Sequence, residues 1–368
     1  MSLSLADGGK FLILGIPGQE VDSTTRELVA AIRPSGFIFF SRNLRSPEQF
    51  RALLDELRRL LPFPPFFAMD QEGGRVSRLR QIGNEPPSAR DLWERGDLSL
   101  VQRHGTLTGR LFRLFGLNWN LAPVLDLGVD EEADNSLRNR CYGRSPAEVS
   151  RFAAAFLEGM RAEGILSCGK HFPGYTFARV DPHEALPVLE RTRAQLEAEE
   201  WQPFRDLLPD CDSLMIGHVR CPNLDPSGLP SSLSPAVVEG ILRQEWRYPG
   251  LLVTDDLDMG AITTLYSLPD AAELALRAGN DLLLVCHRPQ LGVEAAERLA
   301  GLPDSVRAAA ERRIEIYRRR LASPIPFSLE RFVDLDARVG RLRADSLSPE
   351  KASRPTLDRA KRSAVETF

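Results

Sequence analysis

The segment from Lys170 to His183 carries more titratable side chains than an ordinary loop, and it reads K-H-F-P-G-Y-T-F-A-R-V-D-P-H. A histidine exchanges protons near neutral pH, and a nearby carboxylate sets its tautomer and stabilises its charged form. Pro182 favours an extended conformation for Asp181, so we expect Asp181 and His183 to point the same way. The pair could supply a proton donor; an ordinary surface turn is the alternative.

Apolar runs of strand length recur eight times, and segments with helical periodicity separate them. Continuous apolar strands that alternate with amphipathic helices indicate a parallel sheet covered by helices. We therefore predict an α/β fold, a (β/α)8 barrel of the TIM type, as a single catalytic domain. The predicted strands are 11–16, 36–40, 66–69, 121–127, 165–172, 213–219, 251–254 and 281–286, and the helices between them are 23–32, 46–61, 100–115, 146–162, 193–208, 235–246 and 271–278.

Polar residues cluster where these predicted strands end, which is where active sites gather in such a barrel. Lys170 and His171 could donate hydrogen bonds to a hydroxylated or anionic ligand, although a salt bridge is the plainer role for Lys170. We predict one active site at this end of the barrel. The residues that follow strands in this way are Asp70 to Arg75, Lys170-His171, His218, Asp255-Asp256 and His287.

Composition favours a globular protein without nucleic-acid or membrane partners. The 368 residues are 43% hydrophobic and 27% charged, with a net charge of −4, and basic residues are interspersed with acidic ones. The N-terminus lacks the pattern of a signal peptide, and no apolar stretch reaches about 18 residues. Five cysteines without C-x-x-C spacing argue against a disulfide framework or a zinc site. We expect reduced thiols and a cytoplasmic location.

Several carboxylates at one barrel mouth suit either metal binding or glycosyl transfer. A metal site would need closely spaced ligands, which only Asp181-x-His183 offers. In glycosyl transfer, an anionic nucleophile stabilises an oxocarbenium-like centre while a proton donor assists the leaving group. Asp255 follows the apolar run Leu251 to Val253, and His183 supported by Asp181 is the best-placed donor. Glycosyl transfer therefore fits better.

These motifs resemble glycoside hydrolase family 3, in particular its single-domain bacterial β-N-acetylglucosaminidases (β-hexosaminidases). The segment 241–258, which ends in L-L-V-T-D-D-L-D, resembles the family's active-site signature, with Asp255 at the nucleophile position. D-Q-E-G-G-R-V-S-R at 70–78 and K-H-F-P-G followed by D-x-H are similar to its other motifs. Further matches lie at 121–126, 215–218 and 278–286. Together the matches span about residues 10 to 320.

The resemblance implies a retaining exo-β-N-acetylglucosaminidase that removes terminal N-acetylglucosamine from cell-wall-derived glycosides, without a cofactor or a metal. Asp255 would be the nucleophile, His183 the general acid and base, and Asp181 its orienting partner. The substrate would be a small amino-sugar glycoside or muropeptide, and we expect a monomer. By analogy, the residues that bind the sugar hydroxyls would be Asp70, Arg78, Arg140, Lys170 and His171.

The chain departs from the family pattern near the proton donor. The family's loop commonly reads K-H-F-P-G-H-G, whereas Tyr175 and Thr176 stand at the last two positions here, and Pro182 replaces a Ser. We expect these residues to restrict the loop that carries His183. Another β-glycosidase specificity, a glycoside phosphorylase or a catalytically silent sugar-binding barrel therefore remain alternatives. His287 also stands where the family often has Asn.

The composition changes after Ser323, which sets the predicted domain boundary. Residues 289–299 and 305–322 are predicted to be the closing helices of the barrel, within a domain spanning 1–323. The extension 324–368 is expected to be partly helical or mobile, with a short helix at 327–342 and a mobile tail from Ser346.

Overall fold

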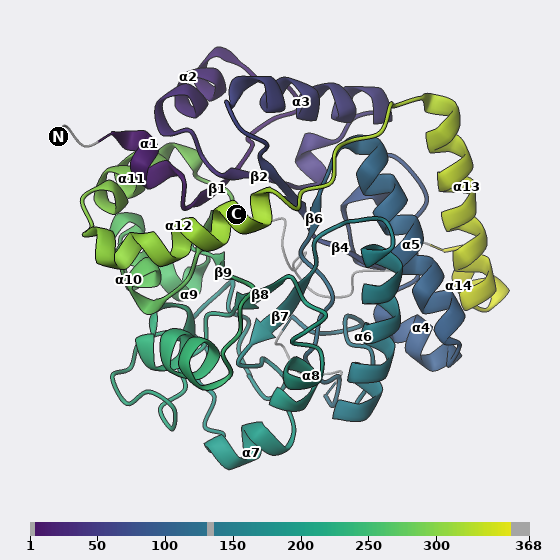
Figure 1. Ribbon diagram of the computed structural model, residues 1–368. Coiled ribbons are helices and arrows are strands. Elements are labelled where there is room, and N and C mark those ends of the chain that lie inside the picture. Colours follow the sequence, from purple (N-terminus) through teal and green to yellow (C-terminus); the bar gives the residue numbers. More distant parts are fainter. Residues whose placement is uncertain (1–3, 131–135, 355–368) are drawn as a thin grey trace.

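The computed structural model describes residues 4–130 and 136–354, and it contains an eight-stranded parallel sheet ringed by helices (Figure 1). Neighbouring strands follow the order β6-β3-β2-β1-β10-β9-β8-β7. Parallel bridges from Trp119 to Leu166 and from Val124 to Lys170 link the two edges, so the barrel is nearly closed. The predicted fold is confirmed. The strands are β1 (Leu12–Gly15), β2 (Gly36–Phe39), β3 (Phe66–Met69), β6 (Trp119–Asn120), β7 (Cys168–Phe172), β8 (Ser213–Ile216), β9 (Leu251–Asp256) and β10 (Leu282–Val285).

The helices form where caps and apolar spacing permit them. In α3 (Pro47–Leu60), Ser46 caps the first turn and proline occupies the first position, where no amide hydrogen is needed. Phe50, Leu53 and Leu57 then form a buried stripe. The other barrel helices are α2 (Ser23–Ile32), α5 (Leu98–Phe115), α6 (Pro146–Arg161), α7 (Arg193–Ala198), α8 (Trp201–Asp206), the π-helix η4 (Ala236–Glu245), α10 (Leu268–Ala278), α11 (Gly292–Ala300) and α12 (Asp304–Arg318).

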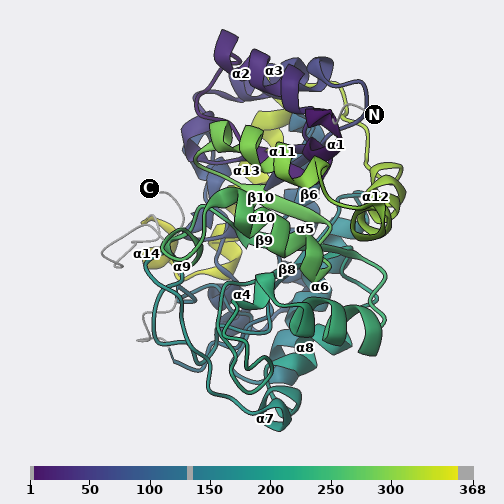
Figure 2. The ribbon, with the colours of Figure 1, turned by 90° about the vertical axis from the view of Figure 1, so that its left-hand side faces the viewer.

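Several shorter elements accompany these strands and helices. The N-terminal helix α1 (Leu5–Gly9) packs against α11 (Figure 2). Helix α4 (Ala89–Arg95) precedes α5, and α9 (Gly260–Thr263) follows β9. Single 3-10 turns are found at Ser41–Asn43, Arg78–Gln81, Ser231–Leu233 and Pro289–Leu291.

Two predicted elements were wrong in extent. The fourth strand was predicted at 121–127, but β6 covers only Trp119–Asn120. Pro123 has no amide hydrogen for a continuous ladder, so the apolar run that follows is buried without being a strand. The helix predicted at 193–208 is split into α7 and α8. Pro203 is tolerated only in the first turn of a helix, and the chain begins a new helix at Trp201 to accommodate it.

A small hairpin that the sequence reasoning did not predict follows β3 and carries several site residues. Its strands are β4 (Gln71–Gly73) and β5 (Val76–Ser77). Gly73 and Gly74 have φ angles of 110° and 54°, which side chains rarely adopt. A Cβ at Gly73 would also lie 2.3 Å from the Pro87 carbonyl oxygen, so the turn requires glycine here.

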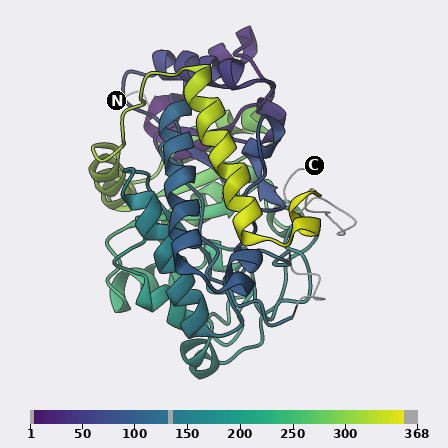
Figure 3. The same cartoon turned by 90° about the vertical axis from the view of Figure 1, so that its right-hand side faces the viewer.

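The C-terminal extension contains a longer helix than predicted. Helix α13 (Leu329–Ser346) lies along α5 on the outside of the barrel (Figure 3). Phe332 packs on Phe115 with ring centroids 5.7 Å apart, and Asp336 accepts hydrogen bonds from the backbone and side chain of Asn84. The predicted mobile tail begins with a short helix, α14 (Pro349–Ala352), and residues 355–368 of it lie outside the described residues.

Two further observations concern the chain as a whole. None of the helices described is both long and apolar enough to cross a bilayer. The five cysteines are buried and free of disulfides.

Candidate active site

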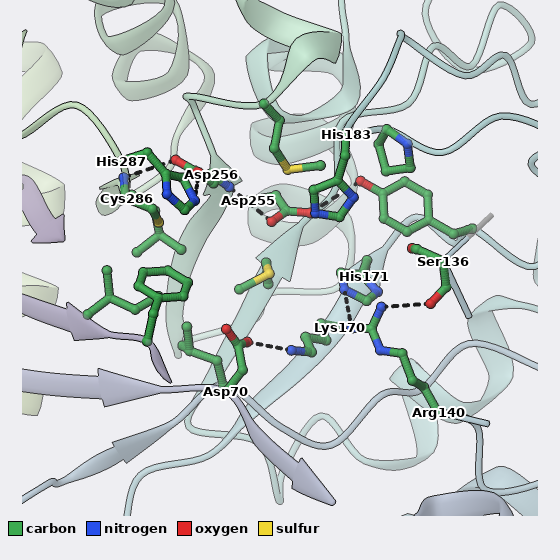
Figure 4. Close-up of a pocket in the computed structure, with 18 residues that line it drawn as sticks. Asp70, Ser136, Arg140, Lys170, His171, His183, Asp255, Asp256, Cys286 and His287 are labelled. Atoms are coloured by element: carbon green, nitrogen blue, oxygen red, sulfur yellow. Dashed lines mark hydrogen bonds and ion pairs between the residues drawn. The ribbon is translucent and has the colours of Figure 1, made fainter. Parts of the chain in front are cut away.

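A cavity opens at the C-terminal ends of the strands (Figure 4). Charged side chains from β7, β9 and the loops after β3, β6 and β7 face it, together with apolar groups such as Met215 and Met259. This is the place where the sequence predicted an active site. The predicted site residues that line the cavity are Asp70, Arg140, Lys170, His171, His183 and Asp255.

Asp255 lies in β9, near its carboxyl end, with both carboxylate oxygens engaged. Oδ1 accepts a hydrogen bond from the backbone N–H of Asp256 at 2.9 Å. Oδ2 lies 3.4 Å from the hydroxyl of Tyr175, which donates to it. The strand therefore delivers the carboxylate to the cavity, and two donors hold it there.

Three histidines keep the Asp255 carboxylate ionised. Burial alone raises the pKa of a carboxyl, but the nearby His171, His218 and His183 outweigh this effect and hold the pKa of Asp255 below its usual value. His218 is fully buried behind the cavity, where its ring contacts Ser232 Oγ at 2.7 Å and the Asp256 carbonyl oxygen at 2.9 Å. Asp255 is thus an anion at neutral pH.

His183 and Asp181 are joined in a tight turn. Asp181 Oδ1 accepts the backbone N–H of His183 at 2.9 Å and lies 2.6 Å from its Nδ1. The predicted pairing is confirmed, and a turn follows Asp181, because the N–H groups of Glu184 and Ala185 both bond back to the Asp181 carbonyl. The aspartate side chain stabilises this turn and holds the Nδ1 edge of the His183 ring.

The loop between β7 and this turn is fastened to the barrel at several points. The Tyr175 N–H donates to Asp126 Oδ1 at 2.6 Å, and the Leu127 N–H donates to Thr176 Oγ1 at 2.9 Å. The Ala261 N–H of α9 donates to the Pro182 carbonyl at 3.1 Å. These contacts hold the loop in a position where His183 faces the cavity.

A buried network of ions forms the opposite wall. Lys170 Nζ lies 2.7 Å from Asp70 Oδ1 and 2.5 Å from Glu72 Oε1. Arg140 pairs with Glu72 through two hydrogen bonds of 2.8 Å each. Despite burial, these carboxylates keep the pKa of Lys170 above its usual value, and the two cations keep the pKa of Glu72 well below its usual range. Lys170 and Glu72 are therefore both charged.

His171 and Arg78 are each held by a neighbouring carboxylate. His171 Nδ1 lies 2.8 Å from Asp126 Oδ2, which orients its ring. Arg78 is buried with Nη2 3.5 Å from Asp70 Oδ2 and over the ring of Phe40, and it does not line the cavity. The structure thus brings six of the eight predicted side chains to the cavity, and the other two, Asp181 and Arg78, each contact one of those six from one layer back.

A second carboxylate, Asp256, lies beside His287 at the cavity wall. Its Oδ2 is 3.5 Å from His287 Nε2, and its Oδ1 accepts the N–H groups of Asp258 and Cys286. Burial and the neighbouring Asp258 raise the pKa of Asp256 to about 8. Burial and the nearby Arg42 lower the pKa of His287 to about 4. Between these values the pair is uncharged, which limits the negative charge beside Asp255.

The sequence placed Glu72, Asp126 and Asp256 near predicted strand ends but assigned none of them a role in the site. Glu72 lies inside the D-Q-E-G-G-R motif. The two cations Lys170 and Arg140 need more than one carboxylate partner, and Glu72 is the second carboxylate of this motif after Asp70. Among the described residues, no group of three or more His, Cys, Asp or Glu side chains has the geometry to hold a metal ion.

Comparison with known proteins gives consistent matches over most of the chain. The Glycosyl hydrolase family 3 N terminal domain matches residues 9–323. A protein named beta-hexosaminidase from Idiomarina loihiensis is 33% identical over 323 residues, which is 87% of this chain and 94% of that protein. Another, from Alkalilimnicola ehrlichii, is 34% identical over 346 residues, 92% of this chain and 97% of that one.

Solved structures agree with the sequence matches. A glycoside hydrolase family 3 beta-N-acetylglucosaminidase from Paenibacillus sp. str. FPU-7 superposes with a TM-score of 0.84 at 31% identity, covering 94% of this chain and 69% of that one. NagZ from Neisseria gonorrhoeae, in complex with N-trifluoroacetyl-D-glucosamine, gives 0.78 at 26% identity, covering 91% and 98%. With its barrel, its cavity and these matches, the chain belongs to glycosyl hydrolase family 3.

Proposed function

We propose that the protein is a retaining exo-β-N-acetylglucosaminidase. The observation that carries the proposal is that an ionised carboxylate, Asp255, and a carboxylate-supported histidine, His183, face one cavity. The relatives named beta-hexosaminidase, and the NagZ structure with a glucosamine derivative, support an amino-sugar substrate. A nucleophile and a proton donor on one cavity are the elements that retaining glycoside cleavage needs.

In the first step, an Asp255 carboxylate oxygen attacks the anomeric carbon as the bond to the leaving oxygen breaks. The protonated His183 gives its Nε2 proton to that oxygen, while Asp181 at Nδ1 stabilises the charged ring. The product is a covalent ester between the sugar and Asp255. The His183 side chain is 20% exposed, so the leaving group and, later, water can reach it.

In the second step, neutral His183 takes a proton from water, and the water oxygen attacks the anomeric carbon. The ester bond breaks, and Asp255 returns to its anionic form. Two displacements at one carbon retain its configuration. The depressed pKa of Asp255 favours this departure, because a carboxylate of low basicity is the better leaving group.

We assign sugar recognition to the ionic wall. Asp70, Lys170 and Arg140 line the cavity and are held rigid by each other and by Glu72, so their remaining donor and acceptor positions can bind hydroxyl groups in fixed geometry. His171 would complete the set. Arg78, one layer back, would act by holding Asp70 in place.

We further propose that the natural substrates are cell-wall-derived glycosides processed in the cytoplasm, as in peptidoglycan recycling. The buried cysteines, none of which forms a disulfide, suit a reducing compartment.

The testing experiment compares hydrolysis of an aryl β-N-acetylglucosaminide and the matching β-glucoside, with and without added phosphate. We expect selective cleavage of the acetamido sugar at a rate independent of phosphate. Phosphate acceleration with a sugar-phosphate product would instead identify a phosphorylase. Preference for the glucoside, or no cleavage of either by folded protein, would refute the proposal.

A further inference from the structure

Tyr175 occupies a position in the cavity wall directly beside Asp255. It is buried, and its ring lies over that of His171 with centroids 4.9 Å apart. Its backbone N–H is fixed by Asp126. Both the main chain and the ring are therefore immobilised, so the direction of the hydroxyl is set by the fold.

The hydroxyl of Tyr175 has one acceptor role and one donor role. The backbone N–H of His218 can only donate, and it lies 2.6 Å from the phenol oxygen. The phenol proton is consequently available to Asp255 Oδ2, 3.4 Å away. Burial and the charge of Asp255 hold the pKa of Tyr175 well above its usual value, so the proton stays on the phenol. A hydrogen-bond chain thus runs from the β8–η3 backbone through Tyr175 to the carboxylate.

The space for this hydroxyl depends on a glycine in the next strand-end loop. A Cβ at Gly217 would lie 2.6 Å from both Cζ and the hydroxyl oxygen of Tyr175. Real Cβ atoms do not approach so closely, so any other residue at 217 would displace the ring. Gly217 and Tyr175 therefore fit each other in this chain.

We propose that Tyr175 is a positioning residue for Asp255. The inference rests on the proposed function, in which Asp255 is the nucleophile. With Oδ1 held by the Asp256 N–H and Oδ2 by the Tyr175 hydroxyl, the plane of the carboxylate is fixed toward the anomeric carbon. The phenol also stabilises the negative charge that returns to Asp255 when the glycosyl ester breaks. A hydrogen bond to the charged form favours that form.

The test is Tyr175→Phe, which removes one oxygen and keeps the ring against His171. The control is Tyr142→Phe, because Tyr142 is also buried but its hydroxyl has no hydrogen-bond partner among the described residues. Both variants are assayed on an aryl β-N-acetylglucosaminide across pH. For Tyr175→Phe we expect kcat/KM to fall about 10-fold, the loss typical of one hydrogen bond to a charged group.

The acidic limb of the pH profile separates positioning from packing. Without the phenol the carboxylate is less stabilised, so the acidic limb of kcat/KM should move to higher pH in Tyr175→Phe and stay in place in Tyr142→Phe. If the acidic limb of the kcat/KM profile stays at the same pH in Tyr175→Phe, the inference is overturned, whether or not activity is lost. Asp255→Ala is measured alongside. If it keeps its activity, the proposed function fails; if it is inactive and the limb is unmoved, only the inference fails.

Discussion

Removing the charge of Glu72 should destabilise the protein more than any surface change of the same kind. Its buried carboxylate neutralises two cations, through two hydrogen bonds of 2.8 Å to Arg140 and a contact of 2.5 Å to Lys170 Nζ. Glu72→Gln keeps the volume but leaves Arg140 without a partner of opposite charge at that position. Breaking one side of a buried ion pair costs about 3–5 kcal/mol.

This cost converts to a measurable change in melting temperature. For 368 residues the entropy of unfolding is about 0.8 kcal/mol/K, so the melting temperature should fall by about 4–6 °C in calorimetry. The control is Glu311→Gln, which loses a partly exposed pair with Lys10 and should change the melting temperature by about 1 °C or less. kcat/KM should also fall, because Lys170 and Arg140 lose their rigid placement. Equal shifts in the two variants would refute this account of the ionic wall.

Three further predictions follow from the site and its scaffold. His183→Ala should slow glycosides with poor leaving groups about 10²–10⁴-fold but activated aryl glycosides far less, since these need little protonation; equal losses would contradict a proton-donor role. Asp256→Asn should gain stability relative to wild type between pH 5 and pH 8.5 in urea titrations. The pKa of Asp256 is raised to about 8, so the free energy of unfolding of the wild type falls as pH rises through that value. Asparagine does not titrate. A difference between the two proteins that does not change with pH would count against this. Gly73→Ala should lower the free energy of unfolding by about 1–3 kcal/mol more than Gly96→Ala. Both glycines have positive φ, but only at Gly73 would the new Cβ collide with another group, the Pro87 carbonyl. Similar costs in the two variants would disprove the collision.

Much of the barrel could be predicted because its strands are short apolar runs between amphipathic helices. Leu282–Val285 and Phe66–Met69 are buried on both faces and leave no other interpretation. The fourth strand could not be located, because the segment around Pro123 is as apolar as a strand but is buried for tertiary reasons. The break before Trp201 was also missed, although Pro203 offered a local signal for it.

The residues of the site could be found from the sequence, but most of their partners could not. Asp255 and Lys170 end apolar runs, so the fold class alone brings them to one mouth. The contact of Glu72 with Arg140 depends on the hairpin turn at Gly73, and that of Tyr175 with Asp255 depends on space left by Gly217. Such contacts arise from how separate loops pack, which residue spacing does not encode.

The central claim is that Asp255 becomes covalently bonded to the sugar. The most direct measurement is intact-protein and peptide mass spectrometry after incubation with a 5-fluoro N-acetylglucosaminyl fluoride, which slows both steps and allows the ester to accumulate. The account predicts one added glycosyl mass on the peptide that contains Asp255, absent in Asp255→Ala. A glycosyl adduct on another residue, or turnover with inverted configuration and no adduct, would contradict it.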